Sequence, residues 1–251
     1  MPFSALTIAE LDIDQPDGGK MKFSVPQTDD MFALVGEILG GKAYPPLMYL
    51  KDAIDCFIDI GANIGGAALY FRLFHDRAAL HCYEPQADSF ALLKKNLGHL
   101  PNVHLTQAAL STAAGEAPLH LAGHAHEFSS LHVGAVPPVL SETVTVLDTA
   151  EELTRAAGRA MAIALKIDTE GNELPILRAI PDELFARVAL VYLEYHSEEA
   201  RLTIDALLHG RGFVLTNSWA DVPHRGKLCY VGNAVLTART HLHAARIGPQ
   251  D

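Results

Sequence analysis

The sequence predicts an α/β fold in which helices cover both faces of a doubly wound, mostly parallel sheet. Short runs rich in β-branched and aromatic residues alternate with helical patterns from about residue 55 nearly to the end of the chain. A glycine-bearing turn, D-I-G-A-N-I-G at residues 59–65, joins the first of these runs to its helix. The chain has 251 residues, 49% of them hydrophobic, which is enough for one large domain with a complete core.

The individual elements follow from local patterns. The second helix is the clearest, because Phe90, Leu93 and Leu97 lie three and four residues apart and share one face. The last helix is expected to end at Gly210, since helices often end at glycine. Pro223 and Gly226 indicate a loop over residues 217–227. The expected strands are 56–60, 79–83, 103–106, 161–167, 188–194, 213–216 and 228–236, and the expected helices are 64–74, 86–97, 171–179 and 198–209.

Two regions do not follow this repeat. Residues 1–50 contain an apolar patch, Met31-Phe-Ala-Leu-Val, followed by paired glycines and paired prolines, and predict a helical cap. In residues 115–147, short strands at 117–121 and 143–146 bracket a loop, and long loops in compact domains are usually functional or mobile. The predicted division is an N-terminal helical cap (1–50), the main domain (51–240) and a C-terminal tail (241–251).

Composition limits the partners and the compartment. A formal charge of −11 argues against a nucleic-acid backbone as the main partner. The three cysteines are odd in number, widely spaced and embedded in apolar runs, which is typical of core thiols in a reducing cytoplasm. There is no secretion signal and no apolar stretch of roughly 18 residues, so we expect a soluble, cytoplasmic protein without a membrane partner. A homodimer is compatible with the sequence, which leaves the oligomeric state open.

The turn at residues 59–65 is predicted to bind a nucleotide cofactor. A strand that ends in a small glycine-bearing turn and enters a helix presents free backbone N–H groups and the positive end of a helix dipole. The Asp59 carboxylate is expected to face the same crevice, where it would repel a pyrophosphate and attract a cationic or hydroxyl-bearing ligand. Asn63 stands where the dinucleotide fingerprint G-x-G-x-x-G has its middle glycine. These features favour S-adenosylmethionine over a dinucleotide.

Glu84 follows the second expected strand and supplies the other half of this site. Ligands of open α/β sheets lie beyond the carboxyl ends of the strands, and an acid there can accept hydrogen bonds from both ribose hydroxyls. Dinucleotide enzymes use the same device, so Glu84 alone does not choose between cofactors. A glycine-rich turn alone is also a common structural connection, but Asp59, the turn and Glu84 in the correct order favour a cofactor site.

A second group of polar residues follows the fourth and fifth strands. Asp168 is expected at a strand tip facing the crevice, with Glu170 and Glu173 sharing one side of the next helical turn. Helix capping is an equally good explanation for Glu173. After the fifth strand, either Glu194 or His196 would act as a base or hold a substrate hydroxyl, because a neutral imidazole suits proton abstraction near pH 7. A solvent-facing loop position is the alternative for His196.

Histidines and serines in the irregular region form a third group. A zinc site is disfavoured, because no cysteine is near, the spacing fits no common site and structural zinc prefers four ligands. Loop histidines that touch substrate are the favoured interpretation. The serines would hydrogen-bond a ligand, although loop serines are common in turns. The residues concerned are His120, His124, His126, His132, Ser129 and Ser130.

The order of four motifs resembles the FkbM family of S-adenosylmethionine-dependent methyltransferases. The motifs are D-I-G-A-N-I-G, Y-E-P, L-K-I-D-T-E-G-N-E-L and L-E-Y-H, and the similarity covers roughly residues 45–236. The third motif is the most characteristic of the family. The resemblance implies a Rossmann-like class I methyltransferase fold, with a seven-stranded sheet whose last strand is antiparallel. It also implies S-adenosylmethionine as cofactor and methyl transfer to a hydroxyl of a sugar or polyketide-like metabolite.

The resemblance also implies residue roles. One departure is Gln107, where relatives usually have Asn, although its amide would still reach the adenine. No metal is required, although the oxygens of Asp168 and Glu170 would suit magnesium. An NAD-dependent oxidoreductase and a non-catalytic cofactor-binding module are the alternatives, and residues 1–50 and 115–147 are expected to recognise the substrate. The implied catalytic residues are Asp168, Glu170 and His196, and the implied cofactor-binding residues are Asp59, Gly61, Ala62, Asn63, Gly65, Glu84, Pro85 and Gln107.

Overall fold

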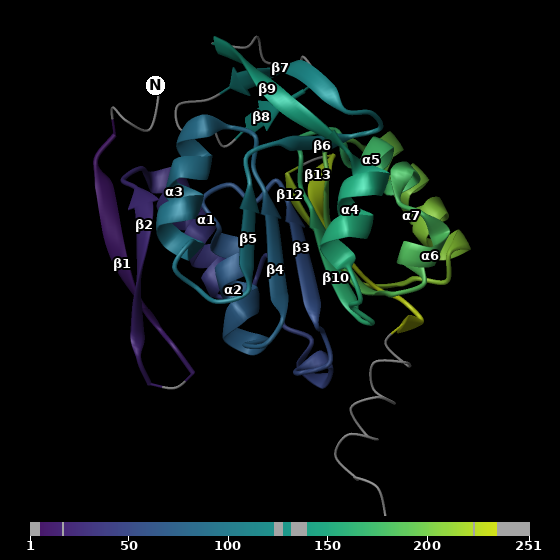
Figure 1. The fold of residues 1–251 in the computed structure, drawn as a ribbon, viewed down its shortest axis with the longest axis horizontal. Helices are drawn as coiled ribbons and strands as arrows, with labels where there is room; N and C mark the ends of the chain where they lie inside the picture. The colour runs from purple at the N-terminus through teal and green to yellow at the C-terminus, as the bar shows by residue number, and fades with distance from the viewer. Residues whose placement is uncertain (1–5, 17, 123–127, 132–139, 223, 235–251) are drawn as a thin grey trace, which may run out of the picture.

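A seven-stranded sheet forms the centre of the molecule (Figure 1). A computed structural model describes residues 6–16, 18–122, 128–131, 140–222 and 224–234. The strands lie in the order β12-β13-β11-β10-β3-β4-β5, and β13 runs antiparallel to both of its neighbours. This confirms the predicted sheet with its antiparallel last strand. The bounds are β3 (Cys56–Ile60), β4 (Ala79–Tyr83), β5 (Val103–Thr106), β10 (Ile163–Ile167), β11 (Val188–Tyr195), β12 (Val214–Val222) and β13 (Arg225–Val231).

Helices cover both faces of this sheet. Every residue of β3 and β10 is buried, as expected for central parallel strands that are covered on both sides. Phe57 of β3 packs in one core with α1 and α2, whereas Ile58 packs in a second core with α4 and α5. One face carries α1 (Asp29–Leu39), α2 (Gly66–Phe74) and α3 (Ala87–Leu97); the other carries α4 (Thr149–Ala157), α5 (Glu173–Ala179), α6 (Asp182–Phe185) and α7 (Glu198–Gly210).

The strand order reverses between β3 and β10. From β3 the chain proceeds outward to β4 and β5, and from β10 it proceeds in the opposite direction to β11. Such a switch point leaves a crevice at the carboxyl ends of the strands, where ligands of open α/β sheets bind. The tips of β3, β4, β10 and β11 therefore surround one location. None of the helices in the described ranges is both long and apolar enough to cross a membrane.

The N-terminal region differs from the predicted helical cap. It begins with an antiparallel hairpin, β1 (Ile8–Asp14) and β2 (Lys20–Pro26), and only then forms α1 and the short helix η2 (Met48–Leu50). The prediction was wrong for the hairpin, because Met21, Phe23 and Val25 alternate with polar residues at the period of a strand and are all buried. Asn96 of α3 holds β2 in place through its side chain, which accepts from the Ser24 N–H (2.7 Å) and donates to the Ser24 carbonyl (3.0 Å).

The irregular region forms a second, smaller sheet. Its strands are ordered β6-β9-β7-β8, and Figure 1 shows it above the carboxyl edge of the main sheet. The expected strands at 117–121 and 143–146 lie within longer observed strands. Leu119, Leu121, Val144 and Val146 form its own small core. The bounds are β6 (Ala109–Ser111), β7 (Gly115–Ala122), β8 (Phe128–Ser130) and β9 (Leu140–Asp148).

The predicted loop over residues 217–227 is mostly strand. Strand β12 continues to Val222 and β13 already begins at Arg225, so the two form an antiparallel hairpin. Gly226 lies inside β13, where a Cβ would come within 2.2 Å of the Trp219 carbonyl oxygen. This glycine therefore serves the close approach of two strands rather than a loop. The predicted C-terminal tail, 241–251, lies outside the described residues.

Candidate functional site

A cleft opens at the switch point, with about 1020 Å³ of empty space that is partly open to solvent. The tips of β3 and β4 supply one part of its lining, and the tips of β10, β11 and β13 supply another. Part of the remaining lining is an apolar wall from the two irregular regions, residues 1–50 and 115–147, whose role in substrate recognition stays a prediction. This apolar wall consists of Leu34, Val35, Ile38, Tyr44, Leu119 and Leu131.

The cofactor turn, Asp59 to Gly65, is held by backbone conformation. Gly61 (φ 81°), Asn63 (φ 50°) and Gly65 (φ 93°) all adopt positive φ. A Cβ on Gly61 would lie 1.8 Å from the Asp168 carbonyl oxygen, so only glycine fits where the β3 and β10 tips meet. Gly61, Ala62 and Asn63 line the cleft as predicted.

Four amides of this turn are not free, contrary to expectation. The Gly61 and Ala62 N–H groups donate to the Tyr83 carbonyl (3.0 and 2.9 Å), and the Gly65 N–H donates to the Ala62 carbonyl (2.9 Å). The Asn63 N–H donates to Glu84 Oε2 (2.8 Å). These four donors are therefore occupied by protein acceptors and do not form a cradle for a pyrophosphate. The turn favours a ligand that is recognised by shape and by Glu84.

Glu84 lies where the sequence placed it, in the cleft wall directly after β4. Its second carboxylate oxygen, Oε1, accepts from the Gln86 N–H (2.8 Å). Each oxygen keeps a lone pair, so the carboxylate can still accept two ligand hydroxyls. Burial raises the pKa of Glu84 to about 7 against the opposing effect of the two backbone donors. Pro85 lines the cleft beside it.

Asp59 does not face the cleft, so that prediction was wrong. Its side chain is fully buried inside β3, where Oδ1 lies 3.2 Å from Lys166 Nζ. Lys166 is the parallel-strand neighbour of Asp59 and also contacts Asp168 Oδ2 (3.4 Å) and the Gly61 carbonyl (2.5 Å). Burial alone would lower the pKa of Lys166, but the carboxylates outweigh it and raise the pKa well above its usual value. Asp59 therefore supports the cofactor turn indirectly, by keeping Lys166 charged.

Two further predicted cofactor residues do not line the cleft. Gly65 is the N-cap of α2, where a Cβ would come within 2.9 Å of Leu93 and Leu97 of α3, so this position serves helix packing. Gln107 is exposed, and the adjacent Ala108 lines the cleft instead. The sequence pattern located the strand end after β5 but not which side chain turns inward.

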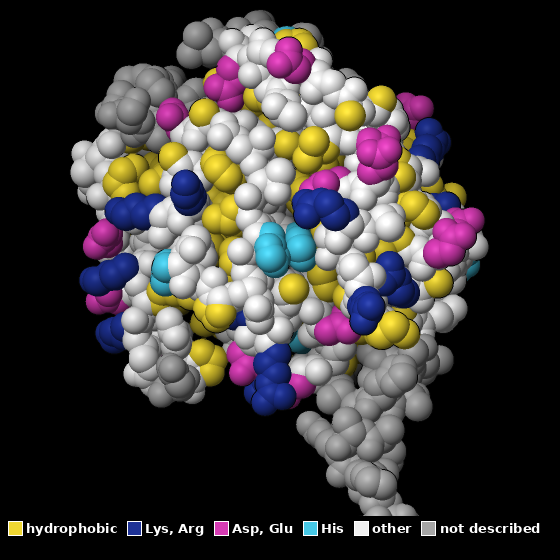
Figure 2. Space-filling model, in the orientation of Figure 1, with side chains coloured by type: hydrophobic (Ala, Val, Ile, Leu, Met, Phe, Trp, Pro, Cys, Tyr) yellow, Lys and Arg dark blue, Asp and Glu magenta, His cyan; other side chains and the backbone are white. Residues whose placement is uncertain are grey.

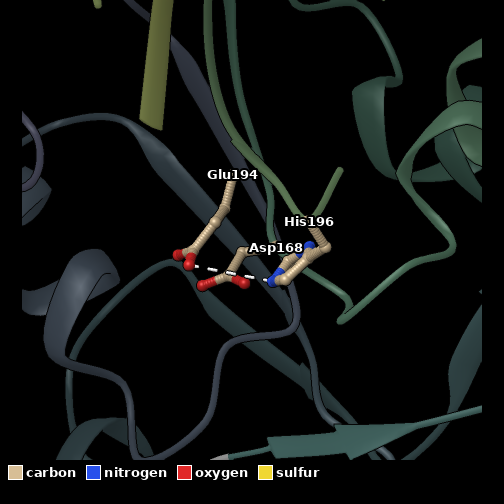
Figure 3. A group of neighbouring side chains, drawn as sticks. All are labelled: Asp168, Glu194 and His196. Carbon is tan, nitrogen blue, oxygen red and sulfur yellow. Dashed lines mark ion pairs between the residues drawn. The ribbon is translucent and has the colours of Figure 1, made fainter. Parts of the chain in front are cut away.

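The acidic cluster consists of Asp168, Glu170, Glu173 and Glu194 with His196. Asp168, Glu170 and Glu194 line the cleft, whereas Glu173 and His196 lie behind them. Figure 3 shows Glu194, Asp168 and His196 pointing toward one another from the tips of β10 and β11. His196 Nε2 lies 3.1 Å from Glu170 Oε2, and its Nδ1 lies 3.3 Å from Glu173 Oε1. The cluster is thus a network of mutually paired charges.

The surroundings of His196 disfavour it as the base at neutral pH. Burial lowers its pKa, but the paired carboxylates of Glu170 and Glu173 outweigh burial and raise the pKa to about 10. The predicted role required a neutral imidazole in contact with the substrate. The structure instead places the imidazole between two carboxylates that favour its charged form, behind the residues that line the cleft. This geometry does not favour His196 as the base, and its catalytic role stays a prediction.

The turn between β10 and α5 differs from the prediction that Glu170 and Glu173 share a helical turn. Helix α5 begins only at Glu173, and Glu170 precedes it with φ 55°. Glu173 Oε1 accepts from the N–H groups of Thr169 (2.9 Å) and Gly171 (3.0 Å). Glu173 therefore organises the turn that precedes α5 rather than capping the helix, whose N-cap Asn172 makes no side-chain cap hydrogen bond, while Glu170 reaches the cleft.

The cluster includes cations that the sequence did not reveal. Lys227 and Arg225 come from β13, and Lys227 is the antiparallel neighbour of Glu194. Lys227 Nζ lies 3.8 Å and Arg225 Nη2 lies 3.6 Å from Glu194. A lysine inside an otherwise apolar strand, G-K-L-C-Y-V, was the available signal.

A divalent metal has a geometric candidate here. Ligand atoms of Asp168, Glu194 and His196 all lie within 4.8 Å of one another, the one such group of three in the described ranges. However, Lys166 and Lys227 already stand beside Asp168 and Glu194, and the surroundings of His196 favour a protonated ring whose proton an ion would have to displace. The residues present therefore do not favour an ion, and the absence of a metal stays a prediction.

The histidines of the irregular region do not form a described cluster. His120 lies in β7, with Nδ1 3.0 Å from Ser141 Oγ, and it does not line the cleft. Ser129 and Ser130 lie in β8. His124, His126 and His132 lie outside the described residues.

Comparisons with known proteins relate this site to methyl transfer. A family model described as "Methyltransferase FkbM domain" matches residues 59–215, more than half of the chain. The chain is 28% identical over 190 residues to the 31-O-demethyl-FK506 methyltransferase FkbM of Streptomyces tacrolimicus, which covers 64% of this chain and 73% of that protein. It is 26% identical over 161 residues to the 2-O-methyltransferase NoeI of Sinorhizobium fredii (strain NBRC 101917 / NGR234), which covers 57% and 63%. The solved structure of the putative methyltransferase yhhF from Escherichia coli is 15% identical, with a TM-score of 0.47 and coverage of 90% and 99%.

Proposed function

Because the chain belongs to the FkbM methyltransferase family, we propose that it transfers a methyl group from S-adenosylmethionine to a hydroxyl group of a small metabolite. The observation that carries the proposal is the position of Glu84. Its carboxylate is fixed by two backbone donors at a strand tip, in the wall of a cleft whose cofactor turn has four of its amides bonded to protein acceptors. The family and this turn together leave no support for the oxidoreductase alternative.

The cofactor would lie across the switch point. Glu84 would accept hydrogen bonds from both ribose hydroxyls, Pro85 and Ala108 would border the adenine, and Gly61 to Asn63 would contact the methionine part. The sulfonium would then face the tips of β10 and β11, where Asp168 and Glu194 supply negative charge. The acceptor would enter beside these residues. Methyl transfer is an in-line displacement, so positioning of the acceptor oxygen contributes much of the rate.

The acceptor class is supported by relatives and by the cleft. One relative is named a 2-O-methyltransferase, and another is named a 31-O-demethyl-FK506 methyltransferase. The wall that Leu34, Ile38 and Leu119 contribute would suit an acceptor that carries an apolar part beside its hydroxyl. We propose a sugar or polyketide-like metabolite rather than a nucleic acid. In support, the face in Figure 2 shows lysine and arginine side chains scattered among acidic and apolar ones.

The proposed compartment is the cytoplasm. Cys56, Cys82 and Cys229 are buried free thiols. Burial raises the pKa of Cys56 to about 12 and that of Cys229 to about 11, so neither is a reactive thiolate at neutral pH. Core thiols of this kind suit a reducing environment.

Isothermal titration calorimetry with S-adenosylmethionine tests the cofactor assignment. The wild-type protein should bind, and Glu84→Ala should weaken binding by at least ~100-fold, because two hydrogen bonds to a charged acceptor are lost. Glu198→Ala, at an exposed position in α7, is the matched control and should bind as the wild type does. The absence of binding heat for the wild type, or equal affinity of the Glu84 variant, would refute the proposal.

A further inference from the structure

The carboxylates of the acidic cluster differ in what holds them. Both oxygens of Glu170 accept from Arg225 Nη2 at 3.1 Å, and Oε2 also lies 3.1 Å from His196 Nε2. Glu173 accepts backbone N–H groups of its own turn and does not line the cleft. These two carboxylates are therefore engaged in maintaining the site.

Asp168 lines the cleft but is a weak proton acceptor. Lys166 Nζ lies 3.4 Å from its Oδ2. Burial favours the neutral acid, but the charges of Lys166, His196 and Lys227 outweigh it and keep the pKa of Asp168 below its usual value. A carboxylate that stays ionised beside the sulfonium would balance the charge of the cofactor rather than take a proton.

Glu194 is held more loosely. It lies one residue before the end of β11 and lines the cleft, with 13% of its side chain exposed. Its cationic neighbours Arg225, His196 and Lys227 stand 3.6, 3.7 and 3.8 Å away, farther than the 3.1 to 3.4 Å contacts of Glu170 and Asp168. Burial and the charge of Asp168 raise the pKa of Glu194 to about 8. A base is most effective when its pKa lies near the working pH.

We propose that Glu194 is the catalytic base that accepts the proton of the acceptor hydroxyl. The assignment rests on the proposed function above. As the acceptor oxygen forms its bond to the methyl carbon, the O–H bond breaks and the proton passes to a Glu194 carboxylate oxygen. The bond between carbon and sulfur breaks and its electron pair stays on sulfur. The products are the methyl ether, S-adenosylhomocysteine and a protonated Glu194, which returns its proton to solvent through the cleft mouth.

This position also couples the base to the cofactor. The sulfonium cation of S-adenosylmethionine would stabilise the ionised form of a nearby Glu194, so cofactor binding would release the proton that Glu194 holds. S-adenosylhomocysteine has a neutral sulfur and would not do so. Proton release from Glu84 would accompany both ligands, because both carry the same ribose. The difference between the two ligands therefore reports on the group beside the sulfur.

Calorimetry of both ligands at pH 8, in two buffers with different ionisation enthalpies, measures this difference. Wild-type protein should release up to about half a proton more with S-adenosylmethionine, since a group with pKa about 8 is half protonated there. Glu194→Gln should bind both ligands and lose the difference. Glu198→Gln, at an exposed position of α7 outside the cleft lining, should keep it.

Equal proton release for the two ligands in the wild type, or a difference that persists in Glu194→Gln, would overturn the assignment. If neither ligand binds, the proposed function fails and the assignment fails with it. Carbon-13 NMR of glutamate-labelled, cofactor-free protein provides a second measurement. The Glu194 carboxyl resonance, assigned from Glu194→Gln or from Glu194→Asp if the first variant does not fold, should titrate well above 4.5. Titration near 4.5 would equally overturn the assignment.

Discussion

The two halves of the cleft hold their polar groups in different ways. In the cofactor half, at the tips of β3 and β4, Glu84 is fixed by backbone N–H groups and the turn amides are fixed by carbonyls. In the acceptor half, at the tips of β10, β11 and β13, ionised side chains such as Glu170, His196 and Arg225 hold one another. Backbone hydrogen bonds therefore position the polar groups of the cofactor half, whereas neighbouring charges position those of the acceptor half.

The largest expected effect on stability comes from Lys166, because its contacts connect the cofactor half of the cleft with the acceptor half. Lys166→Met leaves Asp59 buried without a counter-charge and should lower the free energy of unfolding by about 3–5 kcal/mol, measured by urea denaturation. The double variant Lys166→Met with Asp59→Asn should recover a large part of this loss. If Lys166→Met is as stable as the wild type, the ion pair between Lys166 and Asp59 does not stabilise the contact between β3 and β10.

A substitution at Gly61 tests the close approach of the β3 and β10 tips through steric fit rather than charge. Gly61→Ala places a Cβ 1.8 Å from the Asp168 carbonyl oxygen at a φ of 81°, and should cost about 3 kcal/mol of stability. Gly36→Ala is the matched control, because this glycine lies in α1 with no atom within 4 Å of the added Cβ. The free energy of unfolding of Gly36→Ala should exceed that of the wild type by about 0.5–1 kcal/mol. Equal stabilities for the two variants in urea denaturation would contradict the close approach.

The pH dependence of cofactor binding isolates the cofactor half. Ribose hydroxyls donate to an ionised carboxylate, and Glu84 has a pKa of about 7 before the cofactor binds. The dissociation constant for S-adenosylhomocysteine should therefore rise about tenfold per pH unit below pH 7 and level off above it. Glu84→Gln should bind more weakly with a flat profile, as measured by calorimetry between pH 5.5 and 8.5. A wild-type affinity that does not change over this range would exclude Glu84 as the titrating ligand group.

Glu84 should also make the stability of the cofactor-free protein depend on pH, and here a rise in pH should weaken rather than strengthen the effect. The folded pKa of Glu84, about 7, exceeds the ordinary value of 4.5, so the folded cofactor-free protein binds the proton more tightly than the unfolded chain does. Its contribution to stability is fully present below pH 4.5 and is lost as the pH rises to 7. A loss of stability over this range that is smaller in Glu84→Gln is the expected result.

The smallest expected effect concerns metal in the acceptor half. Since Lys166 and Lys227 already stand beside Asp168 and Glu194, removal of divalent ions with EDTA should change S-adenosylmethionine binding and turnover less than about twofold. Addition of magnesium should have equally little effect. A large loss with EDTA that magnesium restores would show that the lysines do not replace an ion.

The comparison also explains which parts of the site could be predicted from sequence. Some cleft residues directly follow strands that the sequence marks clearly by apolar runs, so their position could be predicted from the strand ends alone. They are Glu84, Pro85 and the turn from Gly61 to Asn63. The prediction that Asp59 faces the cleft was wrong because the chain segment around Asp59 does not show its neighbour in the sheet. That neighbour is Lys166, a buried lysine of β10 that pairs with the Asp59 side chain. The charge state of His196 depends on Glu170, Glu173 and their turn geometry, which no local pattern contains.

The two hairpins, β1–β2 and β12–β13, were also missed by the sequence prediction. Polar and apolar residues alternate over residues 10–14 of β1 and residues 20–25 of β2, a short signal beside the helical pattern from Met31 onward. Strand β13 brings Lys227 and Arg225 to the acidic cluster only because it inserts antiparallel between β11 and β12. The register of such non-local pairing depends on the whole sheet and cannot be read from one segment.

A crystal structure with S-adenosylhomocysteine is the most direct test of the division into a cofactor half and an acceptor half. The account predicts both ribose hydroxyls within hydrogen-bond distance of the Glu84 carboxylate, with the sulfur directed toward Asp168 and Glu194. A ribose that does not touch Glu84, or a sulfur directed toward β4 and away from the acidic cluster, would contradict it.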